Sequence, residues 1–418
     1  MNGFTFVFLT FVLATSAVHL WLAGRQRLSA LRHRQQVPEA FRGQIDSTVH
    51  EKAADYTAAK MRLEQVDVVI GARLVLAWTL GGGLNALAAA WDMSGWGAVA
   101  AGTGLVISAL LVMALLDMPM DIYRTFVVEA KFGFNRTTPA LYFSDTVKQG
   151  VISLLLGTPI IAILLWLVMH AGAWWWVYGW LIWTAFTLVM LWLYPTLIAP
   201  LFNRFTPLQD EALRERIVNL LKRCGFNNGG IFVMDGSKRS QHGNAYFTGF
   251  GTNKRIVFFD TLLKSLQPDE IEAVLAHELG HFKHGHVRKR FILITVTSLV
   301  AFAILGALVN APWFYSGLGV RHPSYATALV LFLLIMPYFS AVMKPVSSYW
   351  MRKHEFEADD YAAAQTNARN LIHALVKLYQ ENAASLTPDS LYSAYHDSHP
   401  PAPIRISHLA AKSPAPAP

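Results

Sequence analysis

Five consecutive residues, His277-Glu278-Leu279-Gly280-His281, are able to carry metal chemistry. Residues four apart on an α-helix lie on one face, so His277 and His281 can both direct an imidazole at a single zinc ion. Pro268 and the acidic residues after it are typical of a helix start, which predicts that the pentapeptide is helical. Glu278 would stand beside the ion as a general base that takes a proton from water. The segment therefore predicts metal-assisted peptide hydrolysis, and the alternative is two surface histidines on a helix.

A zinc site with two histidines needs a third protein ligand and an open position for water. The best candidates are Glu355 and Asp359, which share a face if their segment is helical. We expect Glu355 to bind the metal, Asp359 to accept a hydrogen bond from a ligand imidazole, and Glu357 to point elsewhere. A solvated acidic face is the alternative. His284 and His286 follow closely, but the longer H-E-x-x-H-x-x-G-x-x-H pattern is absent, so three histidine ligands are not expected.

Two further groups of residues are candidates for handling a substrate. Asn244 and Ala245 begin a segment with strand character, and an edge strand there would pair with an extended peptide. His399, before a proline, and Arg405 offer an imidazole and a cation that would stabilise the oxyanion formed on an attacked carbonyl. Ordinary loop polarity is the alternative for both groups.

The composition indicates a membrane protein. Of the 418 residues, 54% are hydrophobic and 15% are charged, and the mean hydropathy is +0.34. The single cysteine, Cys224, forms no internal disulfide, which leaves histidine, aspartate and glutamate as metal ligands. The net charge of +8 does not by itself indicate nucleic acid, because cytoplasmic loops of membrane proteins are rich in lysine and arginine. We expect membrane lipids and no nucleic acid among the partners.

Seven apolar runs are long enough to cross a hydrocarbon core of about 30 Å. They cover residues 3–22, 70–91, 97–117, 150–170, 174–200, 290–311 and 325–345. Basic residues gather between the first two runs, whereas the turns at 92–96 and 171–173 contain none. The positive-inside rule then places the N-terminus outside and the candidate active site and C-terminus in the cytoplasm. The first run has no basic segment before it, so it reads as a retained anchor.

These patterns predict an all-α membrane protein of about seven helices with a small α+β cytoplasmic zinc-protease region. The polar segment after the fifth run predicts a helix at 209–223, a break at 225–230, and strands at 231–234, 244–250 and 255–259. The expected regions are a membrane region with five helices and two cytoplasmic loops (1–200), the metalloprotease segment (201–289), helices six and seven (290–345), cytoplasmic helices (346–412) and a disordered tail (413–418).

With these motifs in order, the chain resembles the CAAX prenyl protease 1 family, integral-membrane zinc endopeptidases of the gluzincin type. The resemblance rests on VP at 37–38, EKAADYT at 51–57 with Lys60, FGFN at 132–135 with Thr138, DGSKRS at 235–240, NAYF at 244–247, DTLL at 260–263, HELGH at 277–281 with Lys283 and His286, EFEAD at 355–359, and HP at 399–400 with Arg405.

The resemblance implies seven helices around a water-filled intramembrane chamber, with the zinc site facing inward at its cytoplasmic end. It also implies one zinc ion held by His277, His281 and Glu355, with Glu278 as the base and Asp359 orienting a ligand histidine. Asn244 and Ala245 would hold the substrate backbone, and His399 and Arg405 would assist the bound carbonyl. Such proteases remove the last three residues of isoprenylated Cys-a-a-X tails.

Three functions are compatible with the sequence. The first is a zinc endopeptidase that acts near a lipidated or membrane-associated segment. The second is a quality-control protease of membrane proteins without prenyl dependence, which suits a host that lacks protein prenylation. The third is a zinc-binding seven-helix transporter or receptor, which needs no base beside the ion. The Pro-Ala-Pro end without an endoplasmic-reticulum retention signal favours a bacterial inner membrane, and we expect a monomer.

Overall fold

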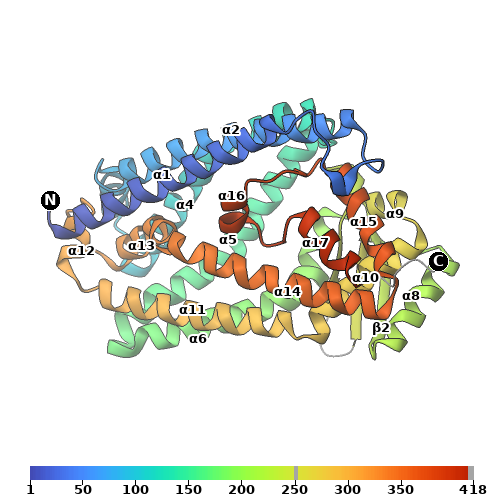
Figure 1. The fold of residues 1–418 in the computed structure, drawn as a ribbon. Helices are drawn as coiled ribbons and strands as arrows, with labels where there is room; N and C mark the ends of the chain where they lie inside the picture. The colour runs from blue at the N-terminus through green and yellow to red at the C-terminus, as the bar shows by residue number, and fades with distance from the viewer. Residues whose placement is uncertain (249–252, 413–418) are drawn as a thin grey trace, which may run out of the picture.

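The computed structural model describes residues 1–248 and 253–412 (Figure 1). The last two residues of the strand expected at 244–250 and the tail expected to be disordered at 413–418 lie outside the described residues. Elsewhere the chain is mostly helical, as the long apolar runs predicted.

Long apolar helices form the larger part of the molecule. Six of them in the described chain are long and apolar enough to cross a membrane, or seven if one bent pair counts as a single span, which agrees with the predicted number. Figure 1 shows α1 and α2 along one side and α6 and α11 along the other. The helices of this region are α1 (Gly3–Arg32), α2 (Ser47–Trp78), α3 (Gly83–Asp92), α4 (Ala98–Tyr123), α5 (Pro139–His170), α6 (Trp175–Leu193), α7 (Ala199–Phe202), α11 (His286–Leu308), α12 (Pro312–Gly317), α13 (Tyr325–Ser340) and α14 (Lys344–Gln365).

The second predicted span, 70–91, is not one straight helix. It consists of the end of α2 and all of α3, which meet at an angle of 46°. Three consecutive glycines, 81–83, follow the end of α2, and Gly82 has a φ of 83°, a conformation that other residues rarely adopt. This glycine run breaks the helix, so the crossing is broken by local backbone chemistry.

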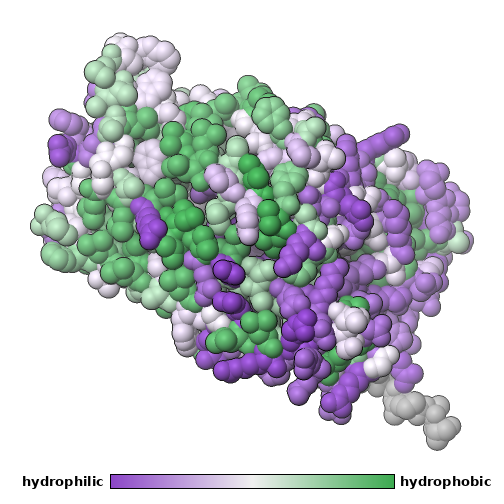
Figure 2. All heavy atoms as spheres, turned by 90° about the horizontal axis from the view of Figure 1, so that it is seen from above, coloured by the Kyte–Doolittle hydropathy of each residue, from purple (hydrophilic) through white to green (hydrophobic). Residues whose placement is uncertain are grey.

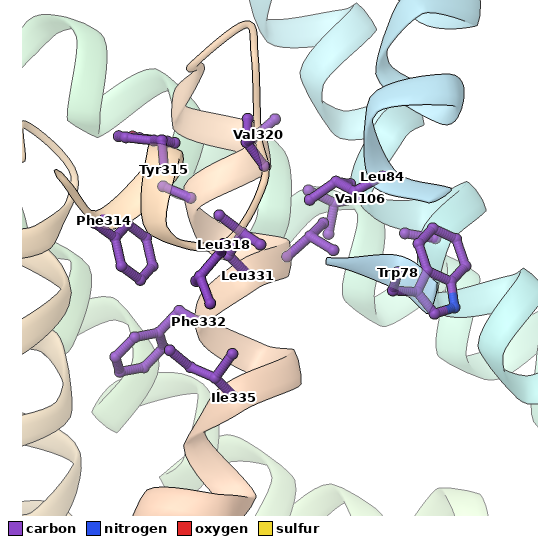
Figure 3. Close-up of a cluster of buried hydrophobic side chains, with 14 of the residues drawn as sticks. Trp78, Leu84, Val106, Phe314, Tyr315, Leu318, Val320, Leu331, Phe332 and Ile335 are labelled. Atoms are coloured by element: carbon purple, nitrogen blue, oxygen red, sulfur yellow. The ribbon is translucent and has the colours of Figure 1, made fainter. Parts of the chain in front are cut away.

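A buried apolar cluster holds the membrane helices together at the end of the molecule away from the candidate site. Figure 3 shows Leu84 and Val106, from α3 and α4, on the side of α13 that carries Leu331, in a cluster that also includes Trp78 of α2 and Phe332 of α13. Leu84, Val106 and Leu331 are at most 1% exposed. Because this packing joins early and late parts of the chain, it fixes α13, and the helix α14 that follows it, relative to the N-terminal helices.

The polar region combines short helices with one mixed sheet. Its helices are α8 (Glu211–Arg223), α9 (Asp260–Ser265), α10 (Pro268–Lys283), α15 (Ala368–Glu381), α16 (Ser390–His396) and α17 (Ala402–Ala410). The sheet has the strand order β1-β2-β4-β3, with β1 (Phe205–Pro207), β2 (Asn227–Met234), β3 (Ala245–Thr248) and β4 (Asn253–Phe259). Only the β2–β4 pair is parallel. Figure 2 shows that hydrophilic residues gather at the end of the molecule that holds this region.

One strand begins earlier than the sequence predicted. The glycines around 229–230 predict a break before a strand at 231–234, but β2 already pairs with β4 at Asn227. The register shifts between Asn228 and Ile231, and Gly230 has a φ of 113°. The glycines therefore form a bulge inside the strand, which bends it without ending it.

Candidate metal centre

Helix α10 places two histidines on the face that packs against α14. Its start is fixed by Pro268 and by a capping box between Gln267 and Glu270. The rings of His277 and His281 lie one turn apart, with centroids separated by 5.0 Å. The pentapeptide is helical, as Pro268 and the acidic residues after it predicted.

Gly280 allows the two helices to approach closely. A Cβ atom at this position would lie 2.9 Å from the Cα of Ala358 and 3.1 Å from its carbonyl oxygen, which are backbone atoms of α14. No side chain fits there without moving one helix. The close approach brings Glu355, three residues before Ala358, towards the two imidazoles.

Glu355 completes a group of three possible ligands. One atom from each of His277, His281 and Glu355 lies within 4.8 Å of the others. The Glu355 carboxylate oxygens lie 3.5 Å from His277 Nε2 and 3.3 Å from His281 Nε2. Zinc bonds of about 2.1 Å in a tetrahedron separate ligand atoms by about 3.4 Å, which matches these distances.

The donor chemistry also fits zinc. Glu355 Oε2 is buried and has no hydrogen-bond partner among the described residues. A buried carboxylate oxygen without a partner is costly, and a metal ion would satisfy it. Two imidazoles and one carboxylate are a known ligand set for catalytic zinc, which keeps its fourth position open.

Asp359 lies behind His277, and Arg405 of α17 lies behind Asp359. The Asp359 carboxylate is fully buried and lies 2.8 Å from His277 Nδ1. Arg405, which is 5% exposed, donates from Nε and Nη2 to the two Asp359 oxygens over 2.9 and 2.5 Å. With Nδ1 held in this way, the other nitrogen of His277 faces Glu355.

These contacts set the charge state of His277. Burial alone would lower the pKa of His277, but the neighbouring carboxylates of Asp359 and Glu355 outweigh it and raise the pKa to about 9. A metal ion that binds here at neutral pH therefore displaces a proton from the ring.

Glu278, the candidate base, lies next to the possible metal ligands. It lines a cavity of about 320 Å³ together with His277 and Glu355. Burial raises the pKa of Glu278 above its ordinary value, while the neighbouring imidazoles act in the opposite direction. A carboxylate with a raised pKa is a better proton acceptor near neutral pH.

The candidate substrate-handling residues reach the same cavity. Asn244 and Ala245 line it, and β3 is an edge strand, as the sequence predicted. His399 also lines it, with a side chain that is 61% exposed and a ring nitrogen 3.4 Å from Glu355 Oε1. Arg405 has two of its nitrogens committed to Asp359, and Nη1 lies 3.5 Å from Glu355 Oε2. Its contacts favour holding Asp359 over reaching a substrate.

The sequence reasoning missed the contacts of His286 and Glu357. His286 Nδ1 lies 2.9 Å from His281 Nδ1, and its Nε2 lies 2.8 Å from a Glu357 carboxylate oxygen. Glu357 does face away from the three possible ligands, as expected, but it is linked to one of them. A signal for this was Gly285, whose φ of 67° turns the chain between α10 and α11 and returns His286 to His281.

Comparisons with known proteins agree over nearly the whole chain. A family model described as "CAAX prenyl protease N-terminal, five membrane helices" matches residues 26–204, and the "Peptidase family M48" model matches residues 207–413. The CAAX prenyl protease 1 homolog of Homo sapiens is 31% identical, with 96% of this chain and 95% of that protein covered. The CAAX prenyl protease 1 homolog of Arabidopsis thaliana is 39% identical, with 70% of this chain and 69% of that protein covered. The crystal structure of S. mikatae Ste24p has a TM-score of 0.90 at 29% identity, covering 98% and 99% of the two chains.

Proposed function

Because the chain belongs to the CAAX prenyl protease 1 family of M48 peptidases, we propose that it cleaves peptide bonds beside lipidated or membrane-associated segments. The chain is a multi-pass membrane metalloprotease, and its substrates are polypeptides. The proposal adds one zinc ion per chain, held by His277, His281 and Glu355. The observation that supports it best is the convergence of these three side chains beside Glu278.

In the proposed mechanism, different residues of the chain activate water, hold the substrate and stabilise the developing charge. When bound, zinc supplies a Lewis acid that acidifies water and polarises the scissile carbonyl. Glu278 takes the proton from the attacking water and delivers it to the leaving nitrogen. Asn244 and Ala245 hold the substrate backbone along β3, since an edge strand can pair with an extended peptide. His399, exposed beside Glu355, stabilises the negative charge that develops on the carbonyl oxygen.

Arg405 would act in two ways in this mechanism. Its Nε and Nη2 hold Asp359, which in turn orients His277. The remaining nitrogen, Nη1, places positive charge near the Glu355 carboxylate and the cavity that Arg405 lines. This charge also favours an oxyanion on the bound carbonyl.

The protein is proposed to be a monomer in a bacterial plasma membrane. Its helices would enclose a water-filled chamber. The N-terminus lies outside, and the site opens to the cytoplasm. The excess of lysine and arginine between the first two spans supports this orientation. The hydrophilic end of the molecule, which holds the sheet and α10, agrees with a site at the boundary between membrane and water (Figure 2).

A pair of matched peptides tests the substrate class. The purified chain is given one Cys-a-a-X peptide with and without a farnesyl group, and kcat/KM is measured for both. We expect a preference of at least about 10-fold for the farnesylated peptide, because each buried methylene contributes about 0.8 kcal/mol. Equal rates would favour the quality-control alternative.

The Glu278→Gln variant is the control for this experiment. It keeps the shape of the site but cannot accept the proton, so the rate of cleavage should fall by at least about 100-fold. Cleavage at an undiminished rate in Glu278→Gln or in excess chelator belongs to a contaminating protease or to a different mechanism. A chain that binds zinc but cleaves no peptide would favour the transporter or receptor alternative.

A further inference from the structure

We propose that Glu357 and His286 are positioning residues that hold the imidazole of His281 with Nε2 directed at the metal. The inference rests on the proposed function, since it assigns a role around the same zinc site. The residue held in this way is His281, whereas Asp359 contacts His277. The contacts involve Glu357, which lies on a different face of α14 from Glu355 and Asp359.

The contacts form a continuous chain. A Glu357 oxygen lies 2.8 Å from His286 Nε2, and His286 Nδ1 lies 2.9 Å from His281 Nδ1. The other nitrogen of His281, Nε2, lies 3.3 Å from Glu355. His286 is 5% exposed, so water does not replace these partners. Every ring nitrogen along the chain has one defined neighbour.

The number of protons fixes the direction of each hydrogen bond. A carboxylate only accepts hydrogen bonds, so Nε2 of His286 must carry a proton and donate a hydrogen bond to Glu357. A neutral imidazole has one N–H, so Nδ1 of His286 is an acceptor. It can accept only from Nδ1–H of His281. The lone pair of His281 is then on Nε2, the nitrogen that faces Glu355.

The placement of protons on His281 and His286 also argues against a second metal ion beside the first. His286, His354 and Glu357 also place possible ligand atoms within 4.8 Å of one another. If His286 bound a metal through Nε2, its proton would move to Nδ1 and face the proton on His281 Nδ1 at 2.9 Å. The rings of His286 and His354 are also stacked, with centroids 4.0 Å apart and an angle of 16°. Lone pairs in parallel ring planes do not converge on one ion.

The two ligand histidines are therefore oriented from different sides. His277 has the Asp359 carboxylate in direct contact, whereas His281 has the Glu357 carboxylate one imidazole away. His286 is the first residue of α11, a candidate membrane span, so the second arrangement ties the metal centre to a membrane helix.

Zinc affinity is the test, measured on the full chain in detergent by competition with a chelator. His286→Phe keeps a ring of similar size but removes both hydrogen bonds, and we expect zinc binding to weaken by about 10- to 100-fold. Glu357→Ala should weaken it in the same direction. Glu357→Gln keeps an oxygen that accepts from His286, so it should restore affinity to within about 3-fold of the unmodified chain.

His354→Phe is the matched control, because it changes the neighbouring ring of the same stack without touching the proposed chain of hydrogen bonds. It should leave zinc affinity and stoichiometry unchanged. Cobalt substitution supplies a second measurement: the visible spectrum should change in His286→Phe and not in His354→Phe. Thermal unfolding of the metal-free proteins should be similar for the two variants, which separates orientation of a ligand from loss of packing.

The outcomes separate this inference from the proposed function. Unchanged zinc affinity and cobalt spectrum in His286→Phe would overturn the inference alone. A second zinc ion in the unmodified chain that is lost in His354→Phe would also overturn it. Zinc binding that follows the expected order in a chain without peptidase activity would overturn the proposed function and leave the inference standing. A chain that binds no zinc would overturn both.

Discussion

Replacing Asp359 by alanine should cause two losses with separate causes. The carboxylate is fully buried between Arg405 and His277. Without it, Glu355 is the carboxylate that remains beside the buried guanidinium, at 3.5 Å. His277 can lose its proton, but a guanidinium cannot. Removing one partner of a buried ion pair costs about 3–5 kcal/mol, and since Glu355 remains, we expect a loss of about 3 kcal/mol in the free energy of unfolding.

The second loss concerns the metal. Asp359 fixes the ring of His277, and its removal should weaken zinc binding by about 10- to 100-fold. The double variant, Asp359→Ala with Arg405→Leu, also removes the buried guanidinium that has lost its carboxylate partner. The double variant should recover most of the stability of the metal-free protein, but its zinc affinity should stay low. This difference separates the charge effect from the orientation effect.

The assays are thermal unfolding in chelator and zinc competition, both in detergent. Asp360→Ala is the matched control, because Asp360 is the next residue and pairs with His408 and Lys412 at the surface. Exposed ion pairs contribute about 1 kcal/mol or less, so this variant should behave like the unmodified chain. The reasoning is refuted if Asp359→Ala is as stable as Asp360→Ala, or if the double variant is no more stable than the single one.

Four other predictions follow from the same structure. Glu278→Gln should retain one zinc ion and lose at least about 100-fold in kcat, whereas His277→Ala should lose both metal and activity; metal analysis and peptide cleavage check this. Glu355→Ala should weaken zinc binding by at least about 10-fold in chelator competition, and unchanged affinity would remove it from the ligand set. Gly280→Ala should lower both zinc affinity and melting temperature, because the added Cβ would meet the backbone of α14 at 2.9 Å. Burial lowers the pKa of His396 from 6.5 to about 4, so stability present above pH 6.5 is lost as the pH falls towards 4, and His396→Gln should show a smaller drop in melting temperature between pH 7 and pH 5.

The parts of the site that follow from local geometry could be predicted from the sequence. Helical spacing alone brings the imidazoles of His277 and His281 to one face, and the same rule pairs Glu355 with Asp359. The number of spans also follows from the length and hydropathy of each apolar run. The break in the second span was visible in the glycines at 81–83, but a hydropathy pattern does not register backbone freedom.

The partners that depend on tertiary packing could not be predicted in this way. Nothing in the sequence around Arg405 indicates that its guanidinium faces Asp359, because α17 and α14 meet only in the folded chain. The sequence predicts only that Glu357 points away from the metal, because helical spacing shows which residues share a face and not what packs against the other face. The contact with His286 depends on the turn at Gly285, which reverses the chain direction after α10.

The order in which the proposed ligands occur along the chain has a consequence for biosynthesis. Two membrane helices, α11 and α13, separate the histidines of α10 from the glutamate of α14. A chain emerging from the ribosome therefore carries both imidazoles well before it carries the acid that completes them. Under the proposed ligand set, an unfinished copy lacks its third ligand, so it cannot cleave newly made neighbours in the bilayer until α14 has been synthesised.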